Sequence, residues 1–254
     1  MVLDIYLLWR SAQAYKKKKA NESKDDIFQL MMRTKDKDIV WDLLRKHVGR
    51  TQSFVTRFTC EEFNRIIDGM SKESLKDLRT AYRDINNERD TLKKIRRQEF
   101  LAMRRIPQAI ALERNTWFHV GANCNQQYMY CLRRMLDPIK EHVDNNFQPM
   151  PKKYLDEFES VRRRINEMMK HTDQMISTNR YNLYRETLII SDECKDELSA
   201  LRERHLNFMQ KDQDAAANMK TSLLYLNILQ ESQEMISIMR HQLRAAYKFI
   251  SEDK

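Results

Sequence analysis

The sequence contains few of the residues that let a chain turn: three Gly and four Pro in 254 residues. A parallel sheet or a β-sandwich would need many more turns, and no stretch has a convincing strand pattern. About a third of the residues are charged, and Met is abundant. The composition therefore predicts an all-α fold, a bundle of long antiparallel helices.

Motifs that carry chemistry are also missing. The sequence has no glycine-rich phosphate-binding loop, no H-E-x-x-H and no nucleophile elbow, which removes the reason to propose an enzyme. The four cysteines, Cys60, Cys124, Cys131 and Cys194, include no C-x-x-C pair. We interpret them as core thiols of a protein in the reducing cytoplasm.

Long apolar runs are absent as well. Residues 1–9 are apolar except for Asp4, and four lysines follow at 16–19. This run is too short to span a bilayer, which takes about 20 residues. Two interpretations remain open: the cytoplasmic edge of a membrane anchor, or an amphipathic helix packed on the bundle. We expect residues 1–35 to form an N-terminal helix and polar linker, and 36–254 the bundle.

The clearest helix signal covers residues 219–250. Two adjacent stripes recur at steps of three and four, which predicts a helix with a wide buried face inside a bundle. The first stripe is Ser222, Tyr225, Leu229, Ser232, Ile236, Met239, Leu243, Ala246 and Ile250. The second is Leu224, Ile228, Glu231, Met235, Ile238 and Gln242.

Other boundaries follow from caps and turn residues. Thr59 is predicted to cap a short helix over 60–68 that Gly69 ends, after a helix over 38–57. Pro107 is expected to open a helix, and Pro138 to kink or restart it. The remaining helices are expected over 71–106, 154–175 and 183–211, with a turn at 147–151.

The chain is basic, with a net charge of +9. The helix over 71–106 concentrates this charge on one side, at Lys93, Arg97 and Arg104. Such a face either lies near an anionic membrane surface or is solvated. Nucleic acid ranks last as a partner, because few aromatic residues are interleaved with these cations.

Residues 109–134 are unusually rich in polar residues for a helix. Asn115, Asn123 and Gln127, together with His119 and Tyr130, are expected to form a polar seam facing another helix. Such a seam either binds a ligand or sets the register of the bundle, and the second alternative is the commoner one.

Four residues are candidate metal ligands: Glu113, His119, Glu231 and Glu234. Carboxylates and histidines on facing helices can build a metal site inside a bundle. The simpler alternative is that the acids form salt bridges with Arg114, Arg240 or Arg244.

Two segments carry a resemblance to a known family. Residues 112–119 (LERNTWFH), continuing to 141–147 (EHVDNNF), resemble the soluble C-terminal region of bacterial PiT-type inorganic phosphate permeases that have a PhoU-like extension. Residues 225–234 (YLNILQESQE) and 239–245 (MRHQLRA) resemble the end of the same region. The resemblance is firmest over 71–250.

The resemblance implies a cytoplasmic bundle of repeated three-helix units at the inner face of the plasma membrane. Its implied partner is the membrane domain of a phosphate permease, in the same or a separate chain, and its implied cofactor is a divalent or ferric metal. Glu113 and Arg114 match the family's acidic motif, while Trp117 stands at the Asp position. We expect a non-catalytic regulator of phosphate uptake; a structural scaffold, which can be a homo-oligomer, is the alternative.

Overall fold

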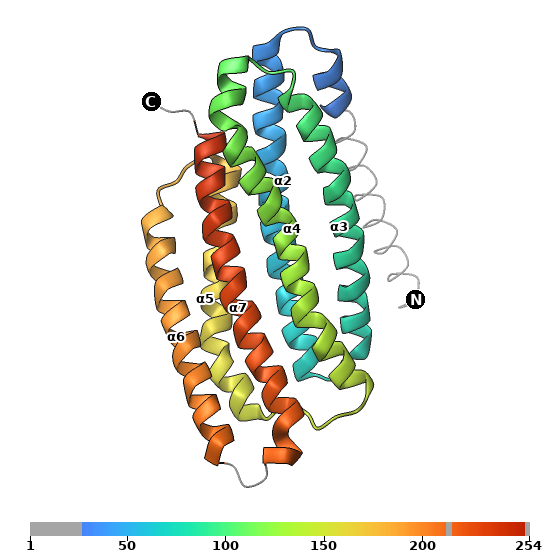
Figure 1. Ribbon diagram of the computed structural model, residues 1–254, viewed down its shortest axis with the longest axis vertical. Coiled ribbons are helices and arrows are strands. Elements are labelled where there is room, and N and C mark those ends of the chain that lie inside the picture. The colour runs from blue at the N-terminus through green and yellow to red at the C-terminus, as the bar shows by residue number, and fades with distance from the viewer. Residues whose placement is uncertain (1–26, 212–214, 252–254) are drawn as a thin grey trace, which may run out of the picture.

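The computed structural model describes residues 27–211 and 215–251. Within them the chain is helical throughout apart from short connections, and no strand is present. A helical segment at 27–33 precedes six long helices. These are α2 (Lys37–Ser71), α3 (Leu75–Met103), α4 (Gln108–Asp144), α5 (Lys152–Thr178), α6 (Tyr184–Lys211) and α7 (Ala215–Ile250). The expected all-α bundle of antiparallel helices is confirmed (Figure 1).

The helices form two successive units of three. In the first, α2, α3 and α4 contact one another, and in the second, α5, α6 and α7 do the same. The units meet mainly where α2 packs on α5 and where α4 packs on α7 (Figure 1). The first helices of the two units are therefore in contact, and so are the third helices. Within the described chain, α3 and α6 contact only helices of their own unit. This arrangement has the form of an approximate twofold repeat, in which matching helices run antiparallel.

Helix α7 lies at the centre of the molecule. Every residue of both predicted stripes is buried, and Leu229, Ile236 and Leu243 are at most 1% exposed. The stripes are both covered because α7 contacts α4, α6, α5 and α2. The prediction of a wide buried face is confirmed.

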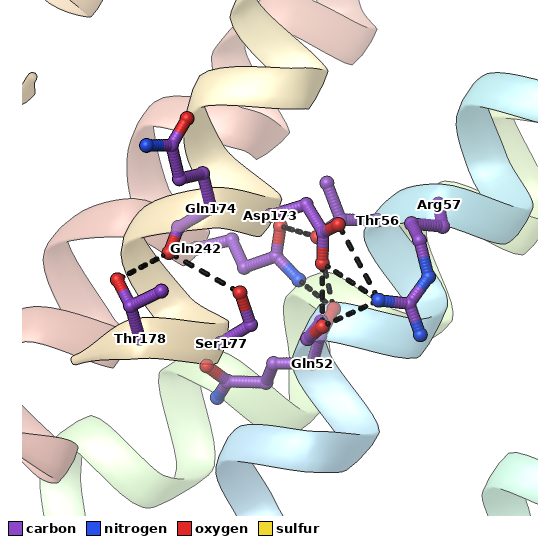
Figure 2. Close-up of polar contacts among 9 residues, drawn as sticks. Gln52, Thr56, Arg57, Asp173, Gln174, Ser177, Thr178 and Gln242 are labelled. Carbon is purple, nitrogen blue, oxygen red and sulfur yellow. Dashed lines mark hydrogen bonds and ion pairs between the residues drawn. The ribbon is translucent and has the colours of Figure 1, made fainter. Parts of the chain in front are cut away.

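A polar cluster interrupts the core where α2, α4 and α7 meet. The Gln242 side-chain oxygen accepts hydrogen bonds from Thr56 (3.1 Å) and from the Tyr128 hydroxyl (3.0 Å). Its amide nitrogen donates to the Gln52 carbonyl (3.3 Å) and to the Asn125 side chain (3.4 Å). Figure 2 shows Gln242 reaching Gln52 and Thr56 across the helix contact. All four bonding positions of the amide are thus used inside the core.

The predicted break at Thr59 is wrong. Helix α2 runs unbroken through it, and Thr59 is completely buried rather than at a helix end. Gly69 also lies inside α2, where a Cβ would come within 2.8 Å of Leu78 on α3. The glycine therefore permits close approach of two helices rather than ending one. Packing of α2 along its length on α5, α3 and α4 overrides the local capping signal.

Two other boundaries also differ. The second helix of the first unit begins at Leu75, capped by Ser74, instead of at 71 or 72. Helix α4 continues through Pro138 to Asp144 without a restart, although one helical hydrogen bond is lost at a proline. The predicted turn at 147–151 is confirmed, and the helices predicted over 154–175 and 183–211 are separated by non-helical residues 179–183.

The described part of the predicted N-terminal segment packs on the bundle. Met31 is fully buried in a cluster that includes Val40, Leu44 and Phe249, and Arg105 donates to the Thr34 carbonyl. Residues 1–26, with the apolar run and the lysines, lie outside the described residues. None of the described helices is both long and apolar enough to cross a membrane.

Candidate anion-binding groove

The basic side of α3 follows from which of its residues are buried. Leu78, Ile85, Leu92 and Ile95 face the core at helical spacing, so Lys93 and Arg97 turn outward. The pattern repeats every three to four residues, which keeps the cations on one side over several turns.

The polar side of α4 borders this basic side of α3 along an open groove. His119, Asn123 and Tyr130 lie at helical spacing on α4 and open into the same groove as the α3 cations. The groove has a volume of about 720 Å³. Its lining comprises Lys93, Arg96, Arg97, Phe100, Phe118, His119, Asn123, Gln126, Gln127 and Tyr130. Residues from two sets that the sequence predicted as separate features therefore line one groove.

The groove is strongly positive. It is lined by three cations and by no carboxylate. Lys93 pairs with Asp90 outside the groove at 3.1 Å, and this hydrogen bond lowers the pKa of Asp90. In residues 27–211 and 215–251, no carboxylate lies within ion-pairing distance of Arg96 or Arg97. Two guanidinium groups are thus available for an anion, which they can bind through paired hydrogen bonds.

Aromatic and amide groups complete the lining. Phe100 is 38% exposed and Tyr130 is 49% exposed, and the His119 ring lies 6.0 Å from that of Phe100. The Gln126 side-chain oxygen is buried without a hydrogen-bond partner among the described residues. Arg104, the third predicted cation, stacks over Phe100 at 4.8 Å and is not one of the residues that line the groove. The site can hold an anion and also contact a planar or polar part of the same ligand.

The predicted polar seam is exposed to solvent rather than buried against another helix. Asn115, Asn123 and Gln127 are exposed; Asn123 and Gln127 line the groove, and Asn115 does not. The buried amide of this helix is Asn125, which bonds to Gln242. Asn123 and Asn125 face different ways because they are two residues apart on the helix, which changes the facing direction of the side chain by about 200°.

The four candidate metal ligands are not brought together. Glu113 is exposed and pairs with Arg114 at 3.0 Å. Glu231 is buried, and both of its carboxylate oxygens bond to Arg134 at 2.8 Å. Arg134 lies 21 residues beyond Glu113 on α4, so the two acids are about 30 Å apart along the helix axis.

The other two candidates lie elsewhere again. His119 is in the groove, and Glu234 is half-buried one turn after Glu231 on α7. Among the residues that the structure describes, no group of three or more His, Cys, Asp or Glu is placed to hold a metal ion. Glu113 and Glu231 instead form salt bridges, which was the simpler alternative for these acids. Their partners are Arg114 and Arg134.

Arg96 lies on the basic side that the sequence predicted, and Tyr130 lies on the predicted polar seam. Sequence reasoning did not assign Phe100 to a site, because it becomes relevant only where α3 and α4 are adjacent. No local signal could have paired Phe100 with His119. No protein-family model and no curated protein matches this chain.

Proposed function

We propose that this chain is a non-catalytic, PhoU-like regulatory module that acts at the cytoplasmic face of an inorganic phosphate permease and controls it. The observation that carries the proposal is the twofold repeat of three-helix units, with α2 on α5 and α4 on α7. A repeat of this kind is the architecture that the resemblance of residues 71–250 implies. Regulation also fits a site whose cations and amides bind a ligand, without a nucleophile beside a base.

The charge at one end of the bundle supports a position near an anionic surface. The start of α2, the end of α3, the start of α6 and the end of α7 lie at the same end (Figure 1). The cations in these helix ends are Lys37, Arg104, Arg105, Arg185 and Lys248, and the acidic residues in the first turns of α2 and α6 are Asp38 and Glu186. Basic residues near an anionic bilayer each contribute about 1 kcal/mol of attraction. This end would face the membrane domain of the permease.

The α3–α4 groove supplies the test. Arg96→Gln/Arg97→Gln removes two groove cations, and uptake of radiolabelled phosphate is measured in cells that carry the permease and the altered chain. We expect the dependence of uptake on external phosphate to resemble that of cells lacking the chain. Arg79→Gln/Arg83→Gln is the matched control, because both side chains are 61% exposed on α3 and lie outside the groove.

Two outcomes would contradict the proposal. Deletion of the chain would leave phosphate uptake unchanged at every phosphate concentration, or both double variants would alter uptake equally. Circular dichroism melting of the purified variants shows whether folding is preserved, so that a loss of regulation is attributed to the groove.

Nucleic acid is a second candidate, which one observation favours. The basic face of α3 has few aromatic residues of its own. In the groove, Tyr130 and His119 of α4 lie with Phe100 of α3 and add aromatic rings to this face. Cations with exposed aromatic rings are typical of sites that bind single strands. This candidate predicts affinity for a labelled oligonucleotide that falls steeply with salt and is reduced by Arg96→Gln/Arg97→Gln.

A further inference from the structure

A second cationic groove lies where the two three-helix units meet. It runs between α2 and the C-terminal end of α5 and has a volume of about 560 Å³. Its lining comprises Arg45, Lys46, Gly49, Arg50, Ser53, Arg57, Ile176, Ser177, Asn179 and Ile250. No sequence pattern singled out these residues, because the groove needs both units to exist.

The cations form a row along α2. Lys46, Arg50, Ser53 and Arg57 are separated by steps of four, three and four, so they lie on one side of the helix. From Lys46 to Arg57 the row extends about 16 Å, at 1.5 Å per residue. Lys46 and Arg50 are exposed. Across the described chain, neither of them has a carboxylate within ion-pairing distance.

The far end of the row is held in place from the second unit. Asp173 of α5 accepts a hydrogen bond from Ser53 at 2.5 Å and pairs with Arg57 at 3.2 Å. Figure 2 shows Arg57 and Asp173 pointing toward each other across the contact between α2 and α5. Ser177 lies one turn further along α5, where its hydroxyl donates to the Gln174 carbonyl. This wall therefore offers hydroxyl and amide groups, at Ser177 and Asn179, opposite the cations.

The charge balance sets the kind of ligand. Four cations line the groove. Among the described residues, Asp173 pairs with Arg57, and Asp42 bonds to Arg45 at 3.2 Å. Two positive charges, on Lys46 and Arg50, remain uncompensated among the described residues. A ligand with at least two negative charges, spaced along a line, would neutralise them and reach toward Arg57.

We propose that the α2–α5 groove binds a linear anion bearing two or more phosphate groups, and that the anion bridges the two three-helix units. Guanidinium and ammonium groups bind phosphate oxygens strongly, and Arg does so through two hydrogen bonds at once. A single phosphate is too compact to extend along a 16 Å row of cations. The groove is concave, which suits a small ligand better than a flat bilayer.

The test is titration calorimetry of the full chain with sodium tripolyphosphate. We expect Lys46→Gln/Arg50→Gln to lower the affinity about 100-fold, since each charge-assisted hydrogen bond accounts for about tenfold. Arg79→Gln/Arg83→Gln removes the same charge from α3, outside both grooves, and should retain the affinity within about threefold. ATP as a second titrant separates the sources: equal affinity means the phosphates alone are bound, and tighter binding means the nucleoside also contacts Ile176 or Ile250.

Hydrogen exchange provides a second readout. Bound tripolyphosphate should slow amide exchange at 174–179 on α5 in the unaltered chain and not in Lys46→Gln/Arg50→Gln. The proposal is overturned if orthophosphate binds as tightly as tripolyphosphate, or if the two double variants lose the same affinity. It is independent of phosphate uptake, so its failure leaves the proposed regulatory function untouched.

Discussion

Arg134 of α4 holds both carboxylate oxygens of Glu231 of α7, each at 2.8 Å. The Glu231 side chain is 8% exposed, whereas that of Arg134 is 51% exposed. The pair therefore joins the two units at a point where one charge is buried and the other reaches water. The hydrogen bonding to Glu231 is the main reason why the pKa of Arg134 is raised. Glu231, which the sequence offered as a metal ligand, serves to join α4 and α7.

Removing the guanidinium should destabilise the fold. In Arg134→Met the buried Glu231 carboxylate loses its partner, and the free energy of unfolding should fall by about 2 kcal/mol at pH 7. Urea denaturation measures the change. In Arg134→Met/Glu231→Leu the buried charge is also removed, so the double variant should be more stable than the single one. A single variant as stable as the unaltered protein would contradict this role.

Two leucines on α7 should differ sharply in their contributions. Leu229 is 1% exposed and Leu223 is 54% exposed on the same helix. Leu229→Ala should lower the free energy of unfolding by about 3 kcal/mol through lost burial and a cavity. Leu223→Ala should change it by less than about 0.5 kcal/mol. Thermal or urea unfolding compares the two, and equal effects would show that the Leu229 stripe does not carry the core.

The Gln242 cluster should matter for stability more than any exposed polar group nearby. Gln242→Leu would leave the Tyr128 hydroxyl, the Asn125 oxygen and the Gln52 carbonyl without these bonds in the core. We expect the free energy of unfolding to fall by about 3 kcal/mol, because unpaired buried polar groups are costly. His241→Leu, at the exposed neighbour, is the control and should be nearly neutral.

Glu62 should make the stability of the protein depend on pH. Its side chain is 3% exposed; one oxygen bonds to Arg65 at 2.7 Å, and the other has no partner among the described residues. Burial raises the pKa of Glu62 from 4.5 to about 7, although Arg65 opposes the shift. Between these values the folded state retains a proton that the unfolded state has lost. The contribution of Glu62 to stability is therefore fully present below pH 4.5 and is lost as the pH rises through 7.

Glu62→Gln isolates this effect. The unaltered protein should lose roughly 1–3 kcal/mol of unfolding free energy between pH 5 and 8 on account of Glu62. The variant should lose less over the same range, and the difference between the two proteins should grow with pH. Glu203→Gln, at an exposed position of α6, should keep the slope of the unaltered protein. Parallel stability curves for Glu62→Gln and the unaltered protein would refute the assignment.

The sequence alone determined that the described chain is helical and which side of α7 is buried. Periodicity carries this information because a helix repeats every 3.6 residues, so both stripes of α7 could be assigned before any neighbour was known. The turn at 147–151 was equally predictable, since Pro149 and Pro151 stand close together there.

Only the tertiary structure decided which helices are neighbours, and the sites depend on that. Local signals at Thr59 and Gly69 suggested helix boundaries, and Pro138 suggested a kink or a restart. Packing along the full lengths of α2 and α4 keeps both helices continuous. Both grooves join side chains from helices that are not paired by any local pattern: Arg97 with Asn123, and Arg57 with Asp173. A charge on one helix becomes a site only when a second helix supplies the opposite wall.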